Sequence, residues 1–207
     1  MYKNYATARD NAWQYLIRHK VKELPVDVFE LCRRDKIVLL PYSTQKAKDV
    51  AEIIGTRELM ELTDGFTLQI KKNPVIFWDD SKPITRQRFT VAHEIGHLKN
   101  GDVGLVPTQR NQEPSENDDS LEVAANVFAS RILAPACVLW ALDVHDPDRI
   151  AEMCHISKTA AHWRYKRLET LYARDKEFQR KYGKSCFLMS PLEEKVYKQF
   201  KRYIRNQ

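Results

Sequence analysis

The stretch FTVAHEIGHLKNGD, residues 89–102, determines how the rest of this 207-residue chain is interpreted. It contains two of the six histidines of the chain, four residues apart, and a glutamate directly follows the first of them. On a helix, residues i and i+4 lie one above the other, so His93 and His97 can direct their ring nitrogens to a common point. Gly96 allows another backbone to approach this helix closely. We therefore expect a buried helix with both histidines on one face.

Glu94 lies about 100° around this helix from His93, which is too far for it to share the same metal position but close enough to reach a water there. The H-E-x-x-H arrangement is typical of metallopeptidases, in which two histidines bind zinc and the glutamate acts as general base. The sequence predicts His93 and His97 as Zn²⁺ ligands and Glu94 as the catalytic acid/base. The alternative is a pair of hydrogen-bonded core histidines without a metal.

A zinc site needs a third protein ligand, and Glu122 is the candidate. It lies near the start of SLEVAANVFASRIL, residues 120–133, where apolar residues and the following Pro135 predict a helix. Asn126 is one turn further along the same face and could hydrogen-bond the free N–H of a ligand histidine. A competing interpretation is that Glu122 completes a helix-capping box with Asp119.

Taken together, RQRFTVAHEIGHLKNGD and LEVAANVFASRILAP resemble the ImmA/IrrE family of metallopeptidases, also described as the IrrE N-terminal-like domain. The resemblance covers about residues 25–172 and implies zinc ligands at His93, His97 and Glu122, with Glu94 as acid/base. One departure is Ala124, where the family often has a second acid. The resemblance also implies a compact gluzincin-like core, with a small sheet packed on the two motif helices.

Members of this family are typically paired with a helix-turn-helix repressor that they cleave or inactivate, which releases stress-response or mobile-element genes. The resemblance therefore implies a zinc endopeptidase whose protein substrate is such a repressor. Its peptide could lie extended along an edge strand of the 65–78 hairpin. His162 and Tyr165 are candidates for stabilising the oxyanion. A zinc hydrolase acting on a non-peptide bond would share the same ligands.

The remaining patterns predict an α+β fold. KIVLLPY, GFTLQI and PVIFW have the composition of short strands, the last two forming a hairpin. Helices are expected at 25–34, with Pro25 at the start, and from Thr85 as N-cap to Gly101 as the stop. Residues 106–120 are polar and predict a surface loop, with the further hypothesis that this loop covers the active-site cleft. We place a zincin-like domain at 1–140 and a helical region at 141–207.

The C-terminal region differs from the rest in charge. Residues 157–207 hold 14 Lys/Arg against 5 Asp/Glu, a net +9, whereas residues 1–156 hold 20 against 23, a net −3. Within this region, residues 149–171 have helix-turn-helix-like spacing, although His155 stands where the turn favours glycine. Three interpretations remain open: a helical hairpin that supports the core, a nucleic-acid contact, and a docking site for a repressor. A non-catalytic DNA- or repressor-binding module using these helices is the alternative to the enzyme.

Composition limits the cellular setting. No run of about 18–20 apolar residues is present, and the first residues lack the apolar segment of a secretory signal, so no membrane association is expected. The four cysteines contain no C-x-x-C pair and predict neither a disulfide framework nor a cysteine-only zinc site. We expect a cytoplasmic protein with buried or idle thiols.

Overall fold

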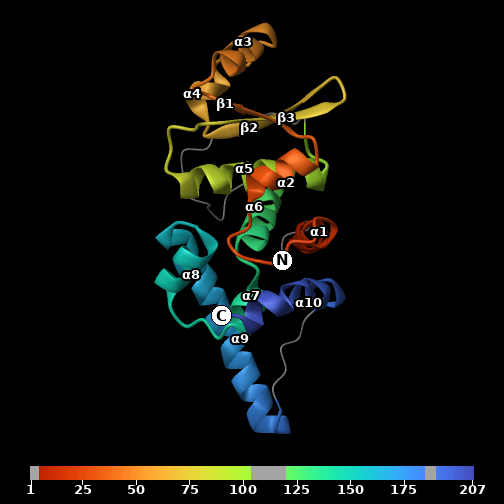
Figure 1. Ribbon diagram of the computed structural model, residues 1–207, viewed down its shortest axis with the longest axis vertical. Coiled ribbons are helices and arrows are strands. Elements are labelled where there is room, and N and C mark those ends of the chain that lie inside the picture. The colour runs from red at the N-terminus through yellow and green to blue at the C-terminus, as the bar shows by residue number, and fades with distance from the viewer. Residues whose placement is uncertain (1–4, 104–119, 185–189) are drawn as a thin grey trace. The chain divides into compact units, whose positions relative to one another are not determined.

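The computed structural model describes residues 5–103, 120–184 and 190–207 (Figure 1). The chain divides into two compact units. The first comprises Met1–Ala12 and Asp27–Ala129, and the second comprises Trp13–Val26 and Ser130–Gln207. The first holds a small sheet and the second is helical in its described part, which confirms the predicted α+β class. The boundary predicted at residue 140 stays a prediction.

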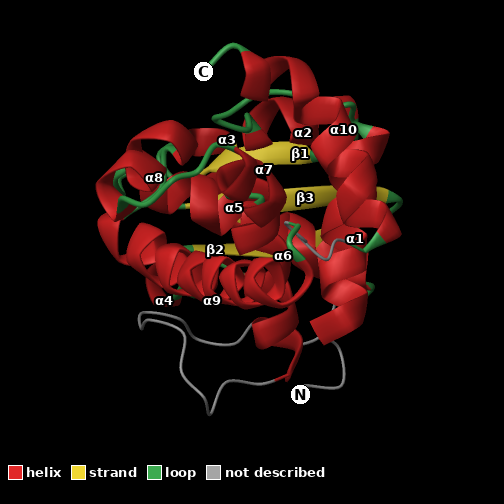
Figure 2. Cartoon of the chain, turned by 90° about the horizontal axis from the view of Figure 1, so that it is seen from below, coloured by secondary structure: helices red, strands yellow, loops and turns green. Residues whose placement is uncertain are grey.

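The sheet of the first unit has three strands, β1 (Val38–Pro41), β2 (Gly65–Ile70) and β3 (Asn73–Trp78), in the order β1-β3-β2 (Figure 2). β3 is central: it runs parallel to β1 and antiparallel to β2. The predicted hairpin is confirmed, with Ile70 opposite Asn73 and Lys71 at a positive φ of 58° in the turn. Among the described strands, β2 therefore lies at an edge.

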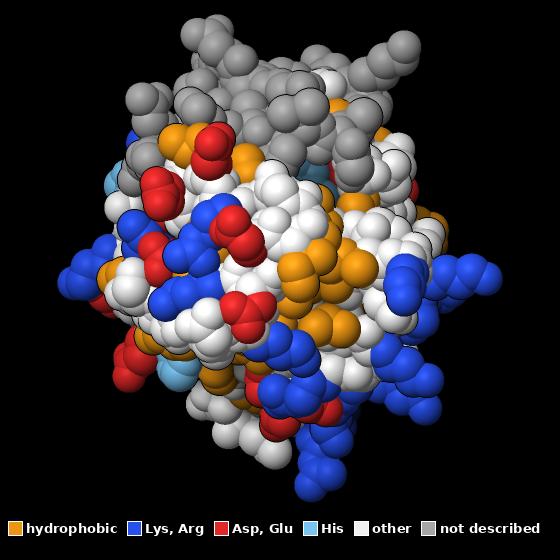
Figure 3. Space-filling model, turned by 90° about the horizontal axis from the view of Figure 1, so that it is seen from above, with side chains coloured by type: hydrophobic (Ala, Val, Ile, Leu, Met, Phe, Trp, Pro, Cys, Tyr) orange, Lys and Arg blue, Asp and Glu red, His pale blue; other side chains and the backbone are white. Residues whose placement is uncertain are grey.

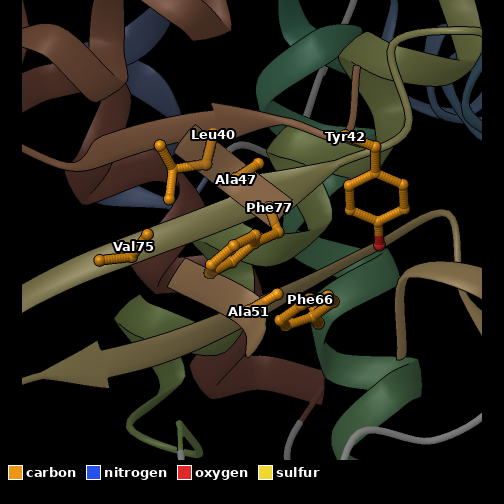
Figure 4. Close-up of a cluster of buried hydrophobic side chains, with 7 residues drawn as sticks. All are labelled: Leu40, Tyr42, Ala47, Ala51, Phe66, Val75 and Phe77. Atoms are coloured by element: carbon orange, nitrogen blue, oxygen red, sulfur yellow. The ribbon is translucent and has the colours of Figure 1, made fainter. Parts of the chain in front are cut away.

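One face of this sheet packs against α3 (Gln45–Ile53) and α4 (Leu59–Leu62). Side chains of a strand alternate between faces, so Val75 and Phe77 of β3 point to the same side. Phe77 stacks on Phe66 of β2, with ring centroids 4.6 Å apart. The buried cluster shown in Figure 4 consists of Leu40, Tyr42, Ala47, Ala51, Phe66, Val75 and Phe77.

The opposite face packs against α5 (Ile84–Asn100), which in turn packs against α2 (Val28–Arg34). Trp78 of β3 donates its indole N–H to Gln87 of α5 at 3.2 Å. A larger residue at position 65 of β2 would clash with α5, because a Cβ on Gly65 would lie 2.4 Å from the methyl group of Thr90. The close contact sets α5, which carries the histidine motif, directly on the edge strand.

Two helix starts differ from the predictions. The expected N-cap Thr85 lies inside the first turn of α5, because the helix begins at Ile84 and Pro83 occupies the cap position without a side-chain hydrogen bond. Pro25 lies ahead of α2 rather than at its first position. The Asp27 carboxylate accepts from the Glu30 N–H at 2.9 Å and so determines where α2 begins. Gly101 is the predicted stop of α5, with φ 81°.

The second unit is built from helices that pack without a sheet in its described part. They are the second half of α1 (Tyr5–Arg18), the end of α6 (Ser120–Leu133), α7 (Ala136–Ala141), α8 (Pro147–Cys154), α9 (Lys158–Tyr182) and α10 (Pro191–Arg205). Gln199 of α10 donates to the carbonyls of Leu16 at 3.2 Å and Val21 at 3.1 Å. The predicted helical C-terminal region is confirmed.

One segment of the described chain, Ser120–Ala141, is long and apolar enough to cross a membrane by length and composition alone. However, 72% of its most apolar window is buried within the molecule, which is typical of a core helix. Cys32, Cys137 and Cys154 are buried, and burial raises the pKa of the Cys32 thiol to about 12. The expectation of buried thiols holds for these three cysteines. The predicted loop at 106–120 lies almost entirely outside the described residues, and a cytoplasmic location stays a prediction.

The surface carries scattered apolar side chains among many charges. The face shown in Figure 3 exposes a group of apolar side chains bordered by lysine and arginine. In the first unit, large apolar side chains are exposed at Ile53, Ile54 and Leu62, on or beside α3 and α4.

Candidate metal centre

α5 places both motif histidines and the intervening glutamate in a nearly closed environment. His93 and Glu94 are each only 6% exposed, and His97 is partly buried. The i, i+4 spacing places the two imidazoles edge to face, with an interplanar angle of 77° and their Nε2 atoms 2.9 Å apart. One ligand atom from each of His93, Glu94 and His97 lies within 4.8 Å of the other two. The helix alone therefore supplies two convergent nitrogens and a neighbouring carboxylate.

α6 lies close to α5 because Gly96 has no side chain. A Cβ at residue 96 would lie 3.1 Å from both the Cα and the carbonyl oxygen of Ala125, and 3.3 Å from the Cβ of Phe128. These distances are shorter than ordinary carbon contacts, which are about 3.5–4.0 Å. The backbone approach expected from Gly96 is thus present, and it brings Glu122 and Asn126 on α6 to the histidines.

Glu122 completes a three-donor set. One carboxylate oxygen lies 3.2 Å from Nε2 of His93, and the other lies 3.3 Å from Nε2 of His97. A tetrahedral zinc with bonds of about 2.0–2.1 Å has donor–donor distances of about 3.3–3.4 Å, so the two distances to Glu122 are of the right size, while the 2.9 Å between the two Nε2 atoms is shorter. The carboxylate is 7% exposed. The structure therefore brings all three predicted ligands together.

Two acceptors orient the histidine rings. The side-chain oxygen of Asn126 lies 3.0 Å from Nδ1 of His93, and a carboxylate oxygen of Asp102 lies 3.1 Å from Nδ1 of His97. Because both atoms are hydrogen-bond acceptors, they favour the tautomer with a proton on Nδ1 and a lone pair on Nε2. In this tautomer both Nε2 atoms, which lie 2.9 Å apart, would direct a lone pair at a bound cation.

The electrostatics also favour a cation. Burial by itself lowers the pKa of His97, but the carboxylates of Asp102, Glu122 and Glu94 outweigh it and raise the pKa to about 10. Three carboxylates, each 6–7% exposed, surround two imidazoles. Buried negative charge is costly unless a positive charge compensates it. Two imidazoles and a carboxylate, with the remaining ring nitrogens hydrogen-bonded, form a donor set that fits Zn²⁺.

Glu94 is oriented by the edge strand. The hydroxyl of Thr67 on β2 donates to one carboxylate oxygen of Glu94 at 2.7 Å, and this contact is buried. Thr67 is on the side of β2 that faces α5, two residues after Gly65, as the alternation of a strand requires. This hydrogen bond limits the rotation of the Glu94 carboxylate beside the histidines.

Sequence reasoning missed Thr67 and Asp102. A signal existed for each: Thr67 is a polar residue within the apolar strand GFTLQI, and Asp102 follows the helix stop Gly101. The cap at Gly101 brings the backbone N–H of Asp102 to the carbonyl of His97 at 3.2 Å, which folds Asp102 back under the ring. His162 and Tyr165 belong to α9 in the second unit, and their suggested role at the oxyanion stays a prediction.

The capping interpretation of Glu122 involves Asp119, which lies outside the described residues. The structure shows Ser120 as the first residue of α6, with Glu122 in its first turn. The Glu122 carboxylate nevertheless faces both imidazoles. This proximity favours the ligand interpretation over a purely local role in the helix.

The small sheet packed on α5, with an H-E-x-x-H motif facing a third acidic donor, has the features of a metallopeptidase-type site. A peptidase family model described as the IrrE N-terminal-like domain matches residues 56–166, more than half of the chain. The chain therefore belongs to the IrrE N-terminal-like family of metallopeptidases. A comparison with curated proteins finds no match.

Proposed function

We propose that this protein is a zinc-dependent endopeptidase of the gluzincin type that hydrolyses a peptide bond in a protein partner. One observation carries the proposal: Glu122 lies 3.2 Å from His93 Nε2 and 3.3 Å from His97 Nε2, beside the buried Glu94. His93, His97 and Glu122 would hold the ion. Asn126 and Asp102 would keep the two rings in the ligand tautomer.

A bound zinc ion would polarise the scissile carbonyl and lower the pKa of the attacking water. The protein's own chemistry rests on Glu94. Its carboxylate accepts a proton from the water as oxygen adds to the carbonyl carbon, and it returns this proton to the nitrogen as the C–N bond breaks. Thr67 holds one carboxylate oxygen at 2.7 Å, which leaves the other to receive the proton.

The edge strand β2 suggests how a peptide is oriented. Its described partner is β3 alone, and Thr67 connects the strand to Glu94. An extended peptide paired with the free edge of β2 would be aligned by main-chain hydrogen bonds, with alternate side chains pointing toward α5. Such binding selects an extended segment and tolerates different sequences.

The partner we propose is a helix-turn-helix repressor, inactivated by cleavage in the cytoplasm. The support is the family relationship, together with the resemblance of both sequence motifs to metallopeptidases that act in this way. Cleavage would then regulate transcription, releasing genes of a stress response or of a mobile element.

The test compares the wild type with Glu94→Gln, Glu122→Ala and, as a control, Glu52→Gln on the exposed side of α3. Zinc content is measured by elemental analysis, and cleavage is measured by mass spectrometry on a library of peptides. We expect about one zinc per chain in the wild type, Glu94→Gln and Glu52→Gln, and a loss of zinc in Glu122→Ala. Cleavage should disappear in Glu94→Gln and Glu122→Ala only.

Wild-type zinc affinity in Glu122→Ala would overturn the proposed ligand set. Normal cleavage by Glu94→Gln would overturn the role of Glu94 as the base. A wild type that binds zinc but cleaves no member of the library, and that instead hydrolyses a non-peptide amide or ester, would replace the endopeptidase with another hydrolase using the same ligands.

A further inference from the structure

α8 and α9 form a helix-turn-helix in the second unit. α8 ends at Cys154, α9 begins at Lys158, and three residues connect them. His155 adopts the left-handed conformation, with φ 49° and ψ 54°, at the position where this motif usually has glycine. Ser157 caps α9 by accepting from the Ala160 N–H at 3.1 Å. The spacing noticed in the sequence therefore corresponds to a true turn between two packed helices.

The buried positions of the pair have the periodicity that this motif requires. Ile150 and Cys154 of α8 and Ala161 and Leu168 of α9 are completely buried, and Ile156 in the turn is 7% exposed. Residues on one helical face recur every three or four positions, so these side chains define an inner face on each helix. The opposite face of α9 consequently takes no part in the packing of α8 against α9.

The outward face of α9 is polar and rich in hydrogen-bond donors. Trp163 is its large apolar member and is 62% exposed, and the Lys166 ammonium lies 4.6 Å from its ring centroid. Docking surfaces for proteins usually have a larger apolar centre. The exposed residues on the first three turns of α9 are Lys158, Thr159, His162, Trp163, Lys166 and Arg167.

The two units differ in net charge. The second unit holds 19 Lys/Arg against 10 Asp/Glu, a net +9, while the first unit holds 15 against 18, a net −3. Lys158 at the start of α9 pairs with Asp148 of α8 at 3.1 Å, so the positive charge offered by the first turns of α9 rests on Lys166 and Arg167. A basic unit containing a helix with exposed donors has the electrostatic character of a nucleic-acid-binding surface.

We propose that the α8–α9 pair binds double-stranded DNA, with the first turns of α9 in the major groove. The groove is about 12 Å wide and admits one helix, whose donors can reach base edges. Lys166 and Arg167 would contact phosphates, whereas Thr159, His162 and Trp163 would face the bases. This inference does not depend on peptidase activity, because no residue of the metal centre takes part in it.

The experiment uses the full-length protein and a fluorescent random-sequence duplex of about 30 base pairs, with affinity measured by anisotropy between about 50 and 200 mM salt. The test variant is Lys166→Glu/Arg167→Glu. The control is Lys201→Glu/Arg202→Glu, which makes the same charge change at two exposed residues of α10. We expect the test variant to lose at least about tenfold in affinity for the duplex. Its plot of log affinity against log salt concentration should be less steep by about 2. The control should change affinity less than about threefold.

Binding should survive removal of zinc by a chelator. In a selection from random duplexes, the wild type should enrich a sequence motif that His162→Ala/Trp163→Ala fails to enrich. Equal losses in the test and control variants would overturn recognition by α9, since diffuse charge would then explain the binding. Competition by poly-glutamate as strong as that by duplex DNA would also overturn it and would point to an acidic protein partner. Unchanged melting temperatures would show that each variant is folded.

Discussion

A carboxylate oxygen of Asp102 lies 3.1 Å from Nδ1 of His97, and this contact joins the end of α5 to the candidate metal centre. The left-handed Gly101 makes it possible, because it turns the chain back at the end of the helix. Removing a carboxylate that orients a ligand histidine typically lowers metal affinity about 10- to 100-fold. We predict a loss of this size for Asp102→Ala, measured by competition with a zinc chelator dye.

The control for Asp102 is Asp49→Ala, which removes an exposed carboxylate of α3 in the same unit. Its zinc affinity should match that of the wild type. Unchanged affinity in Asp102→Ala would show that Asp102 does not support His97.

Thr67→Val tests whether the edge strand orients the general base. Valine has nearly the same shape but cannot donate to Glu94, and hydrogen bonds to charged groups contribute about 1.5–3 kcal/mol. We predict that kcat on a cleaved library peptide falls about tenfold or more, with zinc content unchanged and little effect on KM. Thr67→Ser, which restores the hydroxyl, should recover most of the rate.

Gln69→Val is the matched control on β2, since Gln69 lies two residues further along the same face and is exposed. A purely structural role for Thr67 would lower stability and raise KM in both the Val and Ser variants. A kcat in Thr67→Val equal to the wild-type value would exclude positioning of Glu94 by this hydroxyl.

Gly96→Ala separates helix propensity from packing. Alanine within a helix is favoured over glycine by about 0.5–1 kcal/mol, so an unconstrained site would gain stability. Here the added Cβ would meet backbone atoms of Ala125 at 3.1 Å, which cannot move aside as a flexible side chain does. We predict a lower melting temperature and weaker zinc binding, because α6 carries Glu122. A higher melting temperature with normal zinc affinity would contradict this prediction.

Arg164 occupies a buried position on α9, where its Nε donates to the Ala134 carbonyl at 2.6 Å. Burial, together with the nearby Arg131, lowers the pKa of this guanidinium to about 10. Methionine keeps much of the volume of this side chain but leaves the Ala134 carbonyl without this donor, which costs about 1–3 kcal/mol. We predict that Arg164→Met lowers the melting temperature and that Arg164→Ala lowers it further by leaving a cavity. A melting temperature in Arg164→Met equal to the wild-type value would show that this hydrogen bond does not stabilise the fold.

The strands and the spacing of the histidines could be predicted because they depend on local patterns. GFTLQI alternates with a period of two, PVIFW is a short apolar run, and the two form the hairpin expected of them around a short turn. The helix starts were less predictable. Thr85 and Pro25 are both residues that often begin a helix, but the chain entering α5 turns at Pro83, and Asp27 provides the cap of α2. Several residues could begin each helix, and packing selects one of them.

The sequence by itself determined that His93 and His97 share a face, because the period of an α-helix is a local property of the backbone. It also indicated Glu122 and Asn126 as partners on a second helix. Only the tertiary structure decided that Gly96 admits α6, that Thr67 reaches Glu94 from β2, and that Asp102 returns to His97. These contacts join separate elements or follow a tight cap, so their geometry depends on how the elements pack.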